Sequence, residues 1–74
     1  MSDSQFLYQL MLRVNEARAK YPRVPLWALF KEVTDLQKEL ECGGNVEQLR
    51  EEALDVACVA LRMAVESWKE AAAA

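Results

Sequence analysis

The chain has 74 residues, of which 53% are hydrophobic, and it carries a net charge of −3. Its two cysteines do not form a CxxC pair and histidine is absent, which argues against a zinc site or a disulfide framework. There is no basic patch with interleaved aromatics, so we expect no binding to nucleic acid. No apolar run approaches the roughly 18 residues of a membrane span, and the N-terminus does not resemble a signal peptide, so we expect a cytoplasmic protein that does not bind membrane.

The N-terminal segment is predicted to form a helix that ends before two prolines. Ser2, Asp3 or Ser4 can cap its start. Its apolar residues recur at the three- and four-residue spacing of one helix face, and they are Phe6, Leu7, Leu10, Met11 and Val14. Pro22 and Pro25 bias the residues before them away from helical geometry, and Pro25 is expected to be the first residue of a second helix.

The second and third helices are predicted to form a helical hairpin over residues 26–68. The apolar stripe of the second helix is Leu26, Leu29, Val33, Leu36 and Leu40. Gly43 and Gly44 end this helix, and Asn45 with Gln48 resembles a capping box that opens the third. We therefore expect an all-α, single-domain chain over residues 1–74, with three helices.

The third helix has two apolar faces, which one neighbouring helix cannot cover. One face is formed by Val46, Leu49, Ala53, Val56, Ala60 and Met63, and the other by Leu54, Cys58, Leu61, Val65 and Trp68. A domain this short has a modest core and gains stability from a metal or a second subunit. We expect a partner subunit, with or without the N-terminal helix, to complete a helical bundle by oligomerisation.

Two pairs of acidic residues have the i,i+3 spacing that places them together on a helix face: Glu32 with Asp35, and Glu52 with Asp55. Each pair borders an apolar stripe, so antiparallel packing brings four carboxylates to one groove, where they repel one another unless a cation intervenes. Oxygen ligands alone favour Mg²⁺ or Mn²⁺. The alternative to a metal site is that these acids are surface carboxylates in local salt bridges, such as Lys31 to Asp35. The acid content of the chain alone is enough to produce two acidic pairs at this spacing.

Around these carboxylates the sequence resembles the MazG-like nucleoside triphosphate pyrophosphohydrolases, whose signature is E-x-x-E followed after a gap by E-x-x-D. Residues 29–36 (LFKEVTDL) stand for the first half and residues 49–57 (LREEALDVA) for the second. The resemblance covers residues 26–66. It implies a helical bundle built by a homodimer or homotetramer. It also implies Mg²⁺-dependent cleavage of (deoxy)nucleoside triphosphates to monophosphate and pyrophosphate, with Mn²⁺ as a possible substitute.

Carried over to this chain, the resemblance makes four residues the metal ligands: Glu32, Asp35, Glu52 and Asp55. A carboxylate not bound to metal, Glu51 or Glu39, is the candidate proton acceptor for the attacking water. Arg62 and Lys38 are candidate phosphate contacts, and Trp27 is a candidate to stack on the base. The alternative for Arg62 is an ion pair with Glu66, and the alternative for Trp27 is a place in the core or an interface.

Three departures from the family keep a second hypothesis open. Lys31 stands where the family commonly has an acid, Asp35 is one methylene shorter than the usual Glu, and the sequence stops at Ala74, where members continue into a further helix. The second hypothesis is a catalytically degenerate MazG-like helical module for oligomerisation or nucleotide binding. A helical adaptor without a metal site is the third.

Overall fold

The computed structural model describes the backbone of residues 1–25 and 27–73, and the side chains of residues 1–25 and 27–66. All regular structure in this part of the chain is helical: α1 (Asp3–Lys20), α2 (Ala28–Glu41) and α3 (Val46–Ala73). The all-α, three-helix prediction is thereby confirmed. Leu26, where the hairpin was expected to begin, and the side chain of Trp68 lie outside the described residues.

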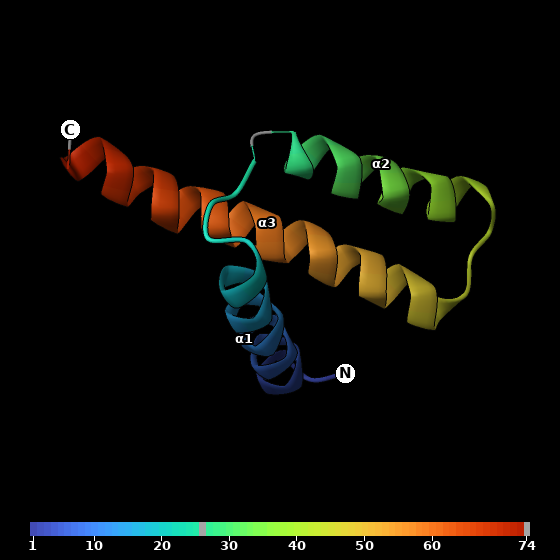
Figure 1. Ribbon diagram of the computed structural model, residues 1–74. Coiled ribbons are helices and arrows are strands. Elements are labelled where there is room, and N and C mark those ends of the chain that lie inside the picture. Colours follow the sequence, from blue (N-terminus) through green and yellow to red (C-terminus); the bar gives the residue numbers. More distant parts are fainter. Residues whose placement is uncertain (26, 74) are drawn as a thin grey trace.

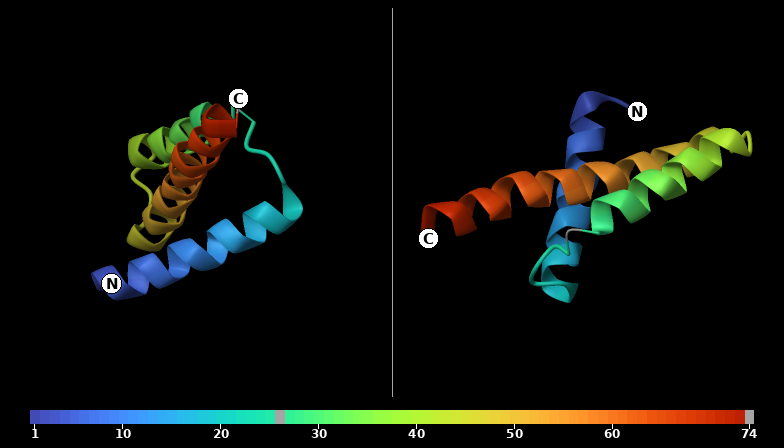
Figure 2. Two further views of the ribbon diagram at one scale, coloured as in Figure 1. Left: turned by 90° about the vertical axis from the view of Figure 1, so that its left-hand side faces the viewer. Right: turned by 90° about the horizontal axis from the view of Figure 1, so that it is seen from above.

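The third helix is the centre of the arrangement (Figures 1 and 2). α2 returns antiparallel along one side of α3, while α1 crosses α3 on its other side. In the described part of the chain, α1 and α2 do not pack against each other. Every contact between helices is therefore made by α3, and the molecule is elongated, measuring 44 × 27 × 19 Å. None of the helices, over the residues described, combines the length and hydropathy that a membrane span requires.

Both α1 and α3 begin at a polar cap that the sequence indicates. The backbone N–H of Gln5 donates to Ser2 Oγ at 3.2 Å, and the Ser2 N–H donates to Gln5 Oε1 at 2.8 Å, so the first cap is Ser2. At the start of α3, the N–H of Gln48 donates to Asn45 Oδ1 at 2.8 Å. These bonds satisfy N–H groups that a helix start leaves without an intrahelical acceptor.

The start of α2 differs from the prediction, because the helix begins at Ala28 and not at Pro25. The N–H of Ala28 donates to the Pro25 carbonyl at 3.0 Å, an i to i+3 bond that closes a turn. Trp27 occupies the N-cap position with no side-chain cap. Pro25 therefore lies in the turn that leads into α2. At the other end of the hairpin, α3 continues to Ala73 and does not end near residue 68.

The turn between α2 and α3 is built on Gly43 and Gly44. Gly43 has a φ of 68°, which lies in the left-handed region that residues other than glycine rarely adopt. The Gly44 N–H donates to the Glu39 carbonyl at 2.9 Å, and the Gly43 N–H donates to the Leu40 carbonyl at 3.3 Å. These two bonds form a Schellman motif, which ends α2 and turns the chain back towards α3.

The most deeply buried core lies between α1 and α3. Leu10 and Val14 of α1 pack with Leu54 and Cys58 of α3, and Val14 and Leu54 are fully enclosed. Partly buried residues surround this cluster: Phe6, Ala17, Ala57 and Leu61. The N-terminal helix thus covers the face of α3 for which we expected mainly a partner subunit.

By contrast, α2 contributes no fully buried side chain. Leu29 and Leu36 are half-buried, whereas Val33 is 45% exposed, Leu40 61% and Phe30 77%. An apolar stripe of α2, formed by Phe30, Val33 and Leu40, therefore faces solvent in the isolated chain.

Candidate functional site

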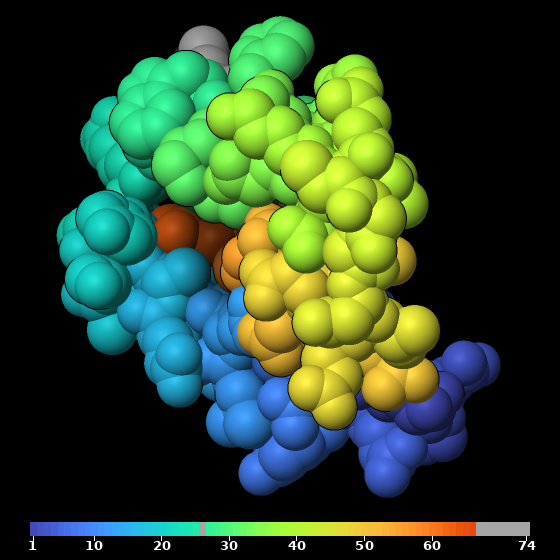
Figure 3. Space-filling view, turned by 90° about the vertical axis from the view of Figure 1, so that its right-hand side faces the viewer, coloured from blue at the N-terminus to red at the C-terminus, as the bar shows by residue number. Residues whose placement is uncertain are grey.

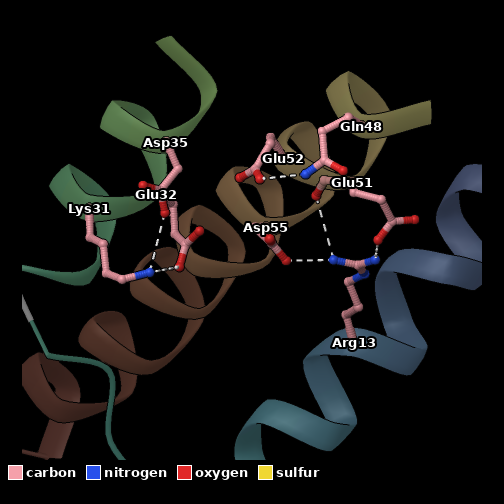
Figure 4. Close-up of polar contacts among 8 residues, drawn as sticks. All are labelled: Arg13, Lys31, Glu32, Asp35, Gln48, Glu51, Glu52 and Asp55. Carbon is pink, nitrogen blue, oxygen red and sulfur yellow. Dashed lines mark hydrogen bonds and ion pairs between the residues drawn. The ribbon is translucent and has the colours of Figure 1, made fainter. Parts of the chain in front are cut away.

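Three carboxylates from two helices converge where α2 lies against α3. Glu32 of α2, Glu52 of α3 and Asp55 of α3 each have a carboxylate oxygen within 4.8 Å of one on both others. Figure 4 shows Glu32 reaching across from α2 towards the two acids of α3. We call these three residues the carboxylate triad. It is the one group of its kind among the described side chains.

The triad fits a hard divalent cation. Mg²⁺ holds oxygen ligands at about 2.1 Å in an octahedron, so two of its ligands lie at most about 4.2 Å apart. Among three ligands of one octahedron, neighbouring ones lie about 3.0 Å apart, so oxygens within 4.8 Å of one another need to close by up to roughly 2 Å to share an ion. A donor set made only of carboxylate oxygens suits Mg²⁺ or Mn²⁺ and not zinc.

Asp35, the fourth ligand expected from the sequence, lies outside the triad. Its carboxylate accepts a hydrogen bond from Lys31 Nζ at 3.2 Å, and Lys31 also pairs with Glu32 at 3.6 Å. This is the local salt bridge that the alternative interpretation expected. Each interpretation therefore describes part of the structure. Glu32, Glu52 and Asp55 lie together as expected for a metal site, whereas Asp35 forms a salt bridge on the surface of α2.

Glu32 is an acid of the triad whose pKa is shifted by its surroundings. Burial raises the pKa of the Glu32 carboxyl, whose side chain is 19% exposed; nearby Lys31 opposes this shift, while Asp55 and Asp35 add to it. The hydrogen bond to Asp35, together with the charge of Glu32, raises the pKa of the Lys31 ammonium. Ionisation of Glu32 is thus less favourable here than in water.

Arg13 of α1 reaches the triad from the side opposite Glu32 (Figure 4), a contact that the sequence analysis did not anticipate. Its Nη1 donates to Asp55 Oδ1 at 2.5 Å and to the Glu51 carbonyl at 3.5 Å, and its Nη2 pairs with the Glu51 carboxylate. Arg13 and Asp55 are 42 positions apart, so local spacing gives no sign of the contact. One feature of the sequence could have indicated that Arg13 faces α3: on a helical wheel it falls beside Phe6, on the apolar side of the first helix.

Three further candidates, Glu51, Glu39 and Lys38, are not members of the triad. Glu51 is held by the ion pair just described. Glu39 lies against Gly44 at the hairpin turn, and its position seven residues after Glu32 places it about 10 Å further along α2. Lys38 is exposed in the last turn of α2.

Arg62, a candidate phosphate contact, is only 3% exposed and lines a groove that Glu32 and Asp55 also line. Its Nε donates to Glu66 Oε2 at 2.9 Å, and its Nη2 donates to the Tyr21 carbonyl at 2.6 Å. The alternative interpretation of Arg62, an ion pair with Glu66, is confirmed. The bond to Tyr21 also fastens the segment between α1 and α2 onto α3.

A groove of about 420 Å³ adjoins the triad, and Glu32 and Asp55 form part of its lining. Figure 3 shows this hollow between α1, the start of α2 and the segment that joins them, with α3 as its floor. Two exposed aromatic side chains, Tyr21 at 55% and Trp27 at 64%, also line it. The structure thus places Trp27, the expected base-stacking residue, on the same groove as two of the expected metal ligands.

Comparison of the chain with known protein families, with curated proteins and with solved structures found no match. The function proposed below rests on the geometry of this site and on the sequence resemblance.

Proposed function

We propose that the chain is a MazG-like, Mg²⁺-dependent nucleotide pyrophosphohydrolase, with Mn²⁺ able to replace Mg²⁺, that cleaves (deoxy)nucleoside triphosphates to monophosphate and pyrophosphate. The observation that carries the proposal is the convergence of Glu32, Glu52 and Asp55 beside a groove with exposed aromatic side chains. A nucleoside triphosphate has a polyanionic end, which binds divalent cations, and a planar aromatic end. The groove offers a complement to both.

Each part of the site has a role in this chemistry. The triad would hold Mg²⁺, which when bound neutralises the triphosphate, orients the attacking water and lowers the pKa of that water. Trp27 offers a flat face on which a base can stack. Lys31, which lines the same groove, adds positive charge for phosphate oxygens. Because Glu51 is paired with Arg13 and Glu39 lies at the hairpin turn, the proposal assigns neither of them the role of proton acceptor.

We further propose that the chain acts as a homodimer or homotetramer. Its accessible surface is 5555 Å². A compact monomer of 8.4 kDa exposes about 4,600 Å², so the isolated chain exposes roughly 950 Å² more. This excess is close to the 800 Å² or so that each partner buries in a standard interface. The apolar stripe of α2, formed by Phe30, Val33 and Leu40, is the surface we assign to a second copy.

A second candidate function is the catalytically degenerate module for oligomerisation or nucleotide binding. The observation that favours it is that protein cations already pair with the acids. Lys31 pairs with Glu32 and Asp35, and Arg13 pairs with Asp55. In this case the site would bind Mg²⁺ or a nucleotide without turnover.

Incubation of the purified protein with ribo- and deoxynucleoside triphosphates and Mg²⁺ tests the proposal, with monophosphate and pyrophosphate measured by chromatography. We expect both products in equal amounts, and we expect Glu52→Gln to abolish their formation. Glu52 is the most suitable triad residue to change, because its one side-chain hydrogen bond in the described structure is with Gln48. The matched control is Glu16→Gln, which removes one exposed acid of α1 and should retain activity.

The same preparations distinguish the two candidates. If no nucleotide is cleaved, yet Mg²⁺ raises the melting temperature of the wild type and not of Glu52→Gln, the binding module is the correct function. If Mg²⁺ has no effect on either protein, both candidates are wrong and the chain is a helical adaptor.

A further inference from the structure

We propose that Arg13 is a positioning residue of the metal centre: its guanidinium fixes the carboxylate of Asp55 for the ion. This inference rests on the proposed function, because it concerns the same cation site. It assigns to α1 a role in a site whose ligands all come from α2 and α3.

The guanidinium is held firmly from its own helix. Arg13 lies next to Val14, which is 0% exposed, and its side chain is itself only 27% exposed. Val14 and Leu10 pack against Leu54, the residue that precedes Asp55 on α3. The most tightly packed part of the core therefore sets the distance between Arg13 and Asp55.

One guanidinium holds two acids of α3. Asp55 Oδ1 accepts from Arg13 Nη1, which leaves its Oδ2 available to a cation. The Glu51 carboxylate is taken by Nη2 of the same guanidinium. An arginine suits this task because its planar fork can grip two acceptors and does not lose its charge. Arg13 thus links Asp55 of the triad to Glu51, which lies one turn before it on α3.

Arg13 also stands behind Asp55 and not in the position of the ion. In Figure 4, Asp55 lies between Arg13 on one side and Glu32 on the other. The groove that adjoins the triad is lined by Asp55 and Glu32 but not by Arg13. A donor in this position orients the ligand without competing for the cation, and loss of such a partner typically weakens metal binding about 10- to 100-fold.

Titration of the full chain with Mg²⁺ or Mn²⁺ alone, followed by melting temperature, tests the inference without reference to turnover. We expect Arg13→Gln to raise the ion concentration needed for half of the stabilisation by about 10- to 100-fold. Arg13→Lys, which keeps the charge but not the fork, should lie between this variant and the wild type. The control that should match the wild type is Arg50→Gln, which removes an equal charge from an exposed position on α3.

The half-saturating ion concentration separates positioning from a purely structural role. Loss of a tie between α1 and α3 would lower the melting temperature with or without the ion and leave that concentration unchanged, which would overturn the inference. Tighter ion binding by Arg13→Gln would also overturn it, because Arg13 would then be a competing counter-ion. If Arg13→Gln does not fold, Arg13→Lys decides by the same criterion. If neither ion raises the melting temperature of the wild type, the metal site itself is refuted and so is the inference. If the wild type responds and Arg13→Gln needs the same ion concentration for half of the stabilisation, the inference alone is refuted.

Discussion

Two leucine-to-alanine substitutions should differ sharply in their effect on stability, because they remove the same atoms from different environments. Leu54 of α3 is 2% exposed between α1 and α3, whereas Leu40 of α2 is 61% exposed. The comparison tests whether the core joins α3 to α1, as the structure shows, or joins α3 to α2, as the leucine stripe of the second helix suggests.

The expected magnitudes follow from burial. Truncation of a fully buried leucine costs about 2–5 kcal/mol, and we expect about 3 kcal/mol for Leu54→Ala. A domain of 74 residues has a total stability of roughly 4–11 kcal/mol, so this loss is a large part of it. At about 4–8 °C per kcal/mol, the melting temperature should fall by roughly 12–24 °C. Leu40 is about two-fifths buried, and the transfer of its three lost carbons then amounts to about 1 kcal/mol.

Urea unfolding of both variants, followed by circular dichroism at several protein concentrations, is the assay. The loss for Leu54→Ala should be independent of protein concentration. The loss for Leu40→Ala should increase where the chain self-associates, because the stripe of α2 is then covered. If Leu40→Ala costs as much as Leu54→Ala at every concentration, α2 and not α1 covers the apolar surface of α3, and our account of the core is wrong.

Two further predictions concern the triad and the assembly. Burial raises the pKa of Glu32 above its ordinary value of 4.5, so the folded state binds this proton more tightly than the unfolded state does. The stability of the metal-free protein should therefore fall as pH rises from about 4.5 through the raised pKa, and Glu32→Gln should remove this fall in urea titrations at successive pH values. An unchanged pH profile in Glu32→Gln would mean that Glu32 is not the group responsible. Light scattering should give two or four times the chain mass of 8.4 kDa, and Phe30→Ser should shift the mass towards that of one chain. A wild type that stays monomeric at high concentration contradicts the assignment of the α2 stripe.

Much of the local architecture could be predicted because short-range chemistry determines it. Ser2 and Asn45 cap helices, and Gly43 provides the left-handed residue that ends α2. The i,i+3 spacing of Glu52 and Asp55 places both on one side of α3, and the hairpin brings Glu32 to them. In each case the participants lie a few residues apart or on consecutive helices.

The unexpected features all depend on which neighbour covers a surface. The sequence gives no direct indication that α1 packs on Leu54 and Cys58, because an amphipathic pattern shows that a face is buried but not what buries it. Arg13 joins the site for the same reason, since its partner lies 42 positions away. Asp35 pairs with Lys31 and lies outside the triad, and its spacing from Glu32 does not determine which of these two places it takes.

The position of α3 between two helices that do not contact each other determines the order in which the protein can be assembled. α2 and α3 are joined by a short turn, so their pairing closes only a small loop. By contrast, Leu10 and Val14 meet Leu54 and Cys58 only after the chain has closed a loop of some 40 residues. The entropic cost of closing this loop is smaller once the hairpin of α2 and α3 has formed and shortened it. On the ribosome, α1 emerges before α2 and α3, and its apolar face stays uncovered until the first half of α3 has been synthesised. During that interval, Leu10 and Val14 of α1 are open to chaperones.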